Sequence, residues 1–320
     1  MKNPSNQFIE ELIKPKIHPD DKLVDVLMET LSLRKEAAYR RLRGEVPYTF
    51  DDIMKISSKY NISLDAIVGN RMPKTALITT SIFDIANPIG SYKEYLHAQI
   101  AIYKEVNKRK DGKALLAFNL IPYVLYSGYK VLNKFRLYRW IHQMDIYGGL
   151  PPFKEMEFPK ELWDIHMEAI EEFSYIKDVS YIFDKGLFLN QVKDILLFVQ
   201  LNLIDKESLY QMKSELLQIL SDIEHMSNGS YNGELKRTVY LSNVSFESSY
   251  LYFEAEDYLI SGLRLLGISL INTRDPWVCH QFKKWIDSLK RYSTLISVSG
   301  EIDRLSFLNQ QKEFISQLDC

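Results

Sequence analysis

Two short helical patterns that follow each other almost without a linker constrain the fold of this chain most. They lie in "KLVDVLMETLSLRKEAAYRRLRGE", residues 22–45. The first pattern has apolar residues at helical spacing: Leu23, Val24, Leu27, Met28 and Leu31. The second pattern, which ends before Gly44, has a thin apolar face: Ala37, Ala38 and Leu42. The sequence therefore predicts two helices joined by a tight turn at 32–33.

The outer face of the second predicted helix is basic. Within residues 34–43, the acid Glu36 stands against five cations: Arg34, Lys35, Arg40, Arg41 and Arg43. The whole chain has a net charge of -2, so this clustering does not follow from a basic composition. In many DNA-binding proteins, the helix that enters the major groove follows a tight turn, has small side chains on its buried face and carries cations on its exposed face. A solvated cationic surface is the alternative. We favour DNA binding because charge, turn and helix order coincide.

The stretch "LVDVLMETLSLRKEAAYRRLRGEVPYTFDDIMKISSKYNISLDAIVG", within about residues 20–69, resembles the helix-turn-helix of Xre and BetR-type bacterial transcriptional regulators. Ser32 departs from this family, which often has glycine in the turn, and Arg34 stands where a capping serine is usual. The resemblance implies a lambda-repressor-like bundle that reads double-stranded DNA. The base-reading residues that it implies are Arg34, Lys35, Tyr39 and Arg40. The phosphate-contacting residues that it implies are Arg41 and Arg43. Arginine and lysine can pair with guanine, and tyrosine can contact phosphate or a thymine methyl group.

The domain organisation predicted from the sequence is a helix-turn-helix domain over 1–72 and a larger domain over 75–320. The segment "NRMPK" at 70–74 separates them. In the first domain, Thr49 with Asp52 three residues later predicts a capping box for the next helix.

The larger domain has few glycine or proline breaks and reads as mostly helical, so the predicted fold class is mainly α. The helical patterns in it lie at 91–110, 160–176, 188–201, 205–226, 276–297 and 302–318. Asp275 and Pro276 predict the start of the fifth of these helices. A stretch rich in β-branched and aromatic residues predicts a small β element near 238–272.

Catalytic and metal-binding patterns are weak throughout the sequence. The six histidines are scattered without an HExxH motif or a paired Cys/His spacing. Cys279 and His280 are adjacent on a predicted helix and point in different directions, so we expect Cys279 to lie in the core. We therefore expect that the protein is not an enzyme and that it has no catalytic residues, no cofactor and no metal. The aromatic stretch 118–140 is typical of a core, which leaves its Arg136 and Arg139 unexplained.

The predicted function is that of a cytoplasmic, sequence-specific transcriptional regulator. Only two cysteines are present, and no apolar run approaches a membrane span or a signal peptide. One copy offers few cations to phosphate, so we expect a homodimer held together by the C-terminal domain, which also senses a signal through an unknown effector or protein partner. Two alternatives stay open: a protein-interaction scaffold with an accessory DNA-binding module, and an enzyme with an unrecognised C-terminal site.

Overall fold

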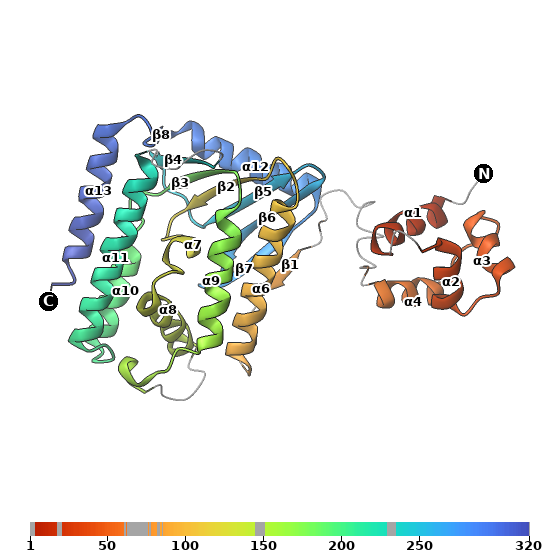
Figure 1. The fold of residues 1–320 in the computed structure, drawn as a ribbon, viewed down its shortest axis with the longest axis horizontal. Helices are drawn as coiled ribbons and strands as arrows, with labels where there is room; N and C mark the ends of the chain where they lie inside the picture. The colour runs from red at the N-terminus through yellow and green to blue at the C-terminus, as the bar shows by residue number, and fades with distance from the viewer. Residues whose placement is uncertain are drawn as a thin grey trace. The chain divides into compact units, whose positions relative to one another are not determined.

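The structure, a computed structural model, forms two compact units, Met1–Leu77 and Ile78–Cys320. The residues that it describes are 4–17, 21–60, 62, 76, 78–81, 84, 86–144, 151–228 and 235–319. Each unit has a hydrophobic core of its own, and Figure 1 draws the first unit in red and orange. The predicted break at 70–74 lies outside the described residues.

The N-terminal unit is a bundle of short helices. Its elements are α1 (Pro4–Ile13), the 3-10 helix η1 (Lys14–Lys16), α2 (Leu23–Leu31), α3 (Lys35–Leu42) and α4 (Phe50–Tyr60). The predicted pair of helices is confirmed, and it is joined by the three residues 32–34. Ala38 is fully buried between α3 and the rest of the bundle. Because this side chain is small, α3 can pack closely against α2. The opposite face of α3 stays in solvent.

The turn between α2 and α3 has a left-handed backbone at Ser32, with φ of 54° and ψ of 43°. The backbone N–H of Ser32 donates to the carbonyl of Met28, which closes the end of α2. Glycine adopts this conformation at little cost, whereas a residue with a Cβ is strained in it. This geometry explains why glycine is usual at this position of the resembling motifs.

Replacing Ser32 with glycine is expected to stabilise the N-terminal unit by about 0.5–1 kcal/mol, because it relieves the left-handed strain. The matched control is Ser58→Gly in the exposed interior of α4, where the same change should destabilise by about 0.5 kcal/mol. Urea unfolding followed by far-ultraviolet circular dichroism measures both changes. Equal effects of the two substitutions would contradict the assigned turn geometry.

The C-terminal unit contains an eight-stranded mixed sheet, so the expectation of a mainly α fold is wrong. The strand order is β1-β7-β6-β5-β2-β3-β4-β8. β2, β3 and β4 are parallel, and the remaining neighbours are antiparallel. The strands are β1 (Thr79–Ser81), β2 (Lys113–Phe118), β3 (Asp178–Phe183), β4 (Lys236–Ser242), β5 (Tyr250–Ala255), β6 (Tyr258–Leu265), β7 (Ser269–Thr273) and β8 (Ser293–Leu295).

The predicted β element near 238–272 is therefore part of a much larger sheet. Sequence periodicity missed β2, "KALLAF", and β3, "DVSYIF", for a physical reason. Parallel strands at the centre of a sheet are buried on both faces, so they read as short apolar runs without alternation. Such runs cannot be told from buried helical segments by their period.

Helices cover both faces of this sheet (Figure 1). The helices are α6 (Pro88–Asn107), α7 (Tyr123–Tyr126), α8 (Lys130–Gln143), α9 (Lys160–Ser174), α10 (Leu189–Gln200), α11 (Lys206–Ser227), α12 (Pro276–Arg291) and α13 (Glu301–Ser316), with the 3-10 helix η2 (Phe153–Glu155). α12 packs with Ala117 and Ile182 on one face of the sheet, and most other helices share the main core on the opposite face. All six predicted helices are present, although the fifth ends at Arg291 and residues 293–295 form β8 instead. The Asp275 side chain accepts from the Val278 N–H as a cap.

Limited trypsin digestion is expected to cut first after Arg71 or Lys74. These sites precede the boundary between the two units in the sequence, and exposed boundaries between compact units are preferred sites of cleavage. Downstream of them, Thr79–Ser81 pairs with β7 in the sheet, and this pairing should protect the peptide bonds of β1. Mass spectrometry of the early products identifies the cut. A first cut inside the 86–144 segment would show that the boundary is assigned incorrectly.

Candidate nucleic-acid interface

The exposed face of α3 contains the four residues that were predicted to read bases. Arg34 precedes the helix with an extended backbone and makes no side-chain capping bond. Lys35 and Tyr39 are one turn apart and exposed, with 38% of Tyr39 accessible. The side chain of Arg40 is 54% exposed. Arg34, Lys35, Tyr39 and Arg40 are called the α3 face below.

Part of the positive charge next to the α3 face is already paired. Arg43 binds Glu36 at 2.9 Å and Glu45 at 2.6 Å, and these hydrogen bonds, that to Glu45 first, raise the pKa of Arg43. Arg40 lies 3.7 Å from Glu45. Exposed pairs of this kind are weak and are screened by salt, so a phosphate group can replace the carboxylate.

Glu45 is a member of this site that the sequence reasoning missed. Glu45 lies two residues beyond the cationic stretch 34–43 and within the same motif, and its acidic side chain there was the available signal. Arg34 and Lys35, by contrast, form no ion pair within the described part of the chain. The N-terminal end of α3 is thus the most positive part of the face.

Arg41 faces the interior of the bundle and binds Asp52. Its Nε and Nη2 donate to the Asp52 Oδ2 at 3.1 Å and 3.0 Å, and only 13% of the Arg41 side chain and 9% of the Asp52 side chain are exposed. The resemblance implies that Arg41 contacts phosphate. The structure gives its guanidinium a different use, so Arg41 is left out of the α3 face.

Asp52 also completes the predicted capping box at the start of α4. The Asp52 N–H donates to the Thr49 Oγ1 at 3.1 Å, and the Thr49 N–H donates to the Asp52 Oδ2 at 2.9 Å. This confirms the capping box. Burial opposes the charge on Asp52, but the Thr49 N–H and the Arg41 guanidinium outweigh it and lower the pKa of Asp52.

A buried amide from α1 also holds the C-terminal end of α3. The Asn6 side chain is 2% exposed, and its Nδ2 donates to the carbonyls of Arg41 at 2.8 Å and Val46 at 2.9 Å. Its Oδ1 accepts from the Tyr48 N–H at 3.4 Å. Together, Asn6 and Asp52 fix the C-terminal end of α3. The sequence reasoning missed Asn6, because an isolated asparagine near a helix start gives no sign of such distant partners.

The chemistry-bearing residues of the C-terminal unit mostly serve its core. His166 is buried, accepts or donates to the hydroxyls of Tyr92 and Tyr123, and burial lowers its pKa to about 3. Cys279 is fully buried, as predicted. No group of three or more His, Cys, Asp or Glu side chains among the described residues could hold a metal ion. Each helix that the structure describes is too short or too polar to span a membrane.

Comparisons with known proteins give little further information. No protein-family model and no curated protein matches this chain, so the resemblance to Xre and BetR-type regulators stays a prediction from the motif. Among solved structures, the chain is similar to TrmBL2, an archaeal chromatin protein whose structure shows a novel mode of DNA binding. That match has 11% sequence identity and a TM-score of 0.26, and it covers 90% of this chain and 98% of TrmBL2. A TM-score this low supports no inference about fold or function.

Proposed function

We propose that this chain is a sequence-specific, double-stranded-DNA-binding transcriptional regulator rather than an enzyme, with α3 as its recognition helix. One observation carries the proposal: a second helix of a short-turn pair exposes Arg34, Lys35, Tyr39 and Arg40 together. The first residues of a recognition helix contact base edges in such motifs. Arg34 and Lys35 occupy this position, at a helix end whose dipole also attracts phosphate.

The internal bonds of the bundle support this proposal, because they fix α3 from behind. Asn6 and Asp52 bond to Arg41, at the C-terminal end of the helix and on its buried side. The residues of the α3 face take no part in these bonds. A rigid helix with free donors loses little conformational entropy when it binds. The ion pairs of Arg40 and Arg43 with Glu45 contribute to specificity. A DNA phosphate must replace Glu45 as their partner, so DNA that places no phosphate there binds more weakly.

Two copies acting together are part of the proposal. With Arg41 bonded inside the bundle, one copy offers few cations to phosphate, and counterion release from one copy is too small for tight binding at physiological salt. Paired recognition helices are expected to enter major grooves about 34 Å apart on one side of the duplex. The large C-terminal unit is proposed to hold the copies together.

Selection of bound fragments from genomic DNA by the purified full-length chain tests the function. The expected result is one enriched motif arranged as an inverted repeat, with half-sites separated by about one helical turn. Enrichment of a single unrepeated motif would support DNA reading and contradict pairing. Recovery of all fragments alike would contradict sequence-specific reading by α3.

A further inference from the structure

Three arginines meet at one cavity in the C-terminal unit, on the side of the sheet that holds the main core. Arg136 and Arg139 come from α8, and Arg264 comes from the end of β6. The carboxylate that faces them across this cavity is Asp194 of α10. Three guanidinium groups and one carboxylate therefore line the same cavity. These three arginines and this cavity are called the arginine cavity below.

Arg136 is the deepest member, and it forms no ion pair with any residue that the structure describes. It is 7% exposed, and neither Nη1 nor Nη2 has a hydrogen-bond partner among the described residues. The rings of Tyr123 and Tyr126 lie 5.4 Å and 5.3 Å from its guanidinium carbon. These rings stabilise the cation from the side, but they leave its donor atoms unused. A buried, unpaired guanidinium is strongly unfavourable unless an anion completes it.

The other two arginines add positive charge instead of removing it. Arg139 forms an ion pair with Asp194. Arg264 is partly buried and has no ion pair or side-chain hydrogen bond within the described residues. Burial and then repulsion from Arg136 lower the pKa of both Arg139 and Arg264. Arg136 thus acts on both neighbours as a like charge, so positive charge is crowded at this cavity.

A structural arginine in the same unit is treated differently. Arg237 is 9% exposed, and its Nη atoms donate to the backbone carbonyls of Ser174 at 2.9 Å, Lys236 at 3.1 Å and Lys177 at 3.3 Å. The donor atoms of this buried guanidinium therefore have hydrogen-bond acceptors, as expected of an arginine that supports the structure. Arg136 lacks such partners, so its unused donors point to a ligand.

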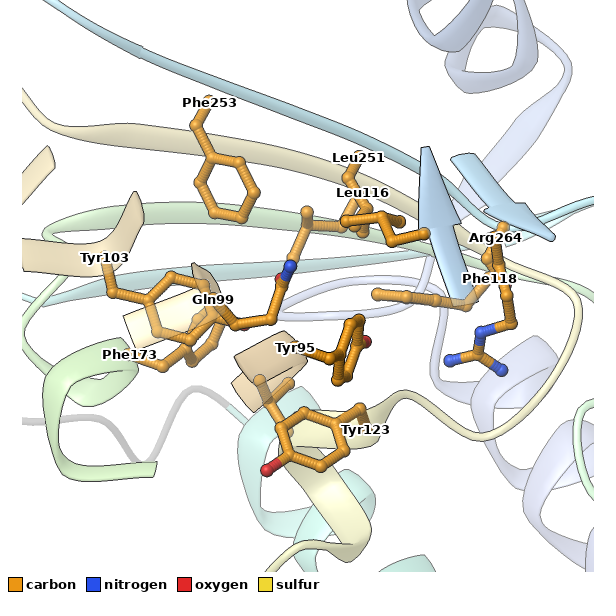
Figure 2. Close-up of a pocket in the computed structure, with 13 residues that line it drawn as sticks. Tyr95, Gln99, Tyr103, Leu116, Phe118, Tyr123, Phe173, Leu251, Phe253 and Arg264 are labelled. Carbon is orange, nitrogen blue, oxygen red and sulfur yellow. The ribbon is translucent and has the colours of Figure 1, made fainter. Parts of the chain in front are cut away.

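A second, apolar cavity adjoins the first, and Arg264 lines both. Aromatic side chains from α6, β2 and β5 surround it, including Tyr95, Phe118 and Phe253. Figure 2 shows Arg264 on one side of this cavity and Phe173 on the opposite side. The space open to the centre of a water-sized sphere is about 30 Å³ in each cavity, which is room for a few water molecules or a small anion. A ligand larger than a small anion must therefore displace side chains when it binds.

We propose that the arginine cavity binds the oxyanion group, carboxylate or phosphate, of a small molecule whose apolar part enters the adjoining aromatic cavity. Arg136 and Arg264 hold the oxyanion with charge-assisted hydrogen bonds, and the unpartnered Arg264 side chain moves to admit it. Binding itself does not depend on the proposed function. The further step, that this small molecule alters DNA binding when it binds, rests on the proposed function.

Thermal unfolding of the full-length chain without DNA tests the site. The probes are inorganic phosphate, acetate, phenylacetate and the neutral phenylacetamide, all at one ionic strength set with chloride. At ten times its Kd, a bound anion is expected to raise Tm by about 3–6 °C, and phenylacetamide is expected to give no rise. A larger rise with phenylacetate than with acetate indicates a carboxylate ligand with an apolar body, and a rise with phosphate indicates a phosphate ligand.

Variants locate the binding. Arg136→Met should leave the ligand-free Tm equal or higher, because it removes a buried unpaired charge, and should weaken anion binding at least tenfold. Arg264→Met, at a more accessible position, should weaken binding similarly without a folding defect. Arg304→Met is the control, since Arg304 donates to the Ile296 carbonyl at 2.9 Å and does not line the cavity; it should keep the full anion response.

Two results would overturn the proposal. The first is a wild-type chain that none of the three anions stabilises more than the neutral amide does. The second is an unchanged anion response in both Arg136→Met and Arg264→Met. Because no DNA is present, either result leaves the proposed DNA binding untouched, and a chain that fails to bind DNA can still show the anion response.

Discussion

Arg40→Ala is expected to weaken binding to the selected site by about 1–3 kcal/mol, or roughly 5- to 150-fold, if Arg40 pairs with a base edge. The side chain of Arg40 is 54% exposed, and the carboxylate within ion-pair distance of it is Glu45 at 3.7 Å. Removing it therefore disturbs little of the bundle. Fluorescence anisotropy with the selected site and with an unrelated duplex measures the loss, which should be much smaller for the unrelated duplex.

Two further substitutions separate base reading from charge. Arg43→Ala should weaken both duplexes alike and reduce the salt dependence of binding by about one unit of slope, because Arg43 lies at the end of α3, where phosphate contact is expected. Lys55→Ala removes an equally exposed cation from α4 and should change neither affinity. Equal affinity of Arg40→Ala and the wild type for the selected site would exclude Arg40 from base reading.

Asp52→Ala is expected to destabilise the N-terminal unit by about 3 kcal/mol, because it leaves the buried Arg41 guanidinium unpaired and breaks the capping box. The control is Asp51→Ala, next in the chain, whose 74% exposed side chain forms an ion pair with the exposed Lys55. That change should cost less than about 0.5 kcal/mol. Hydrogen exchange of the α3 and α4 amides measures the loss in the full-length chain.

Tryptophan fluorescence provides an internal reference for this experiment. All 4 tryptophans of the sequence lie at position 140 or later, in the C-terminal unit. Their unfolding transition should therefore stay in place in Asp52→Ala while exchange in the N-terminal unit increases. Similar protection of α3 in Asp52→Ala and Asp51→Ala would show that the Arg41–Asp52 pair contributes little.

The same pair predicts the pH dependence of the N-terminal unit. The folded-state pKa of Asp52 lies below the ordinary value of 3.8. A depressed carboxyl pKa contributes stability that is fully present above the unfolded-state value and is lost as the pH falls through the folded-state value. Wild-type protein should thus lose this contribution only in strong acid, and Asp52→Ala should lack that part of the acid sensitivity.

Local signals in the sequence predicted the N-terminal unit well, because its elements are set by nearby residues. The apolar stripe of α2, the thin face around Ala38 and the Thr49–Asp52 capping box all lie within a few residues of their partners. The contacts of Asn6 with Arg41 and Val46 cross 35 and 40 positions, and no period or spacing reveals them. The ion pair of Arg41 with Asp52 inside the bundle likewise depends on how α3 packs against α4.

The sheet of the C-terminal unit and the arginine cavity depend on contacts of still longer range. β2 lies between β3 and β5, and its pairing partners are distant in the sequence. Arg136 stood out in the sequence as an arginine in an aromatic stretch, which is the available sign of the cavity. Its meeting with Arg264 required the sheet topology, since β6 follows α8 by more than a hundred residues.

The pairing of Thr79–Ser81 with β7 limits how far the N-terminal unit can reach. Ile62 is still packed in the core of the N-terminal unit. Between Ile62 and Thr79, the start of β1, the chain has 16 residues, which extend to at most about 60 Å. Loss of the three-residue β1 ladder would lengthen this tether by about 10 Å. In a paired assembly, the tether length sets the range of half-site separations that both recognition helices can reach at once. Affinity for duplexes with stepwise increased half-site spacing should therefore fall at a spacing set by the tether, and insertion of glycine and serine residues after 72 should move that limit outward.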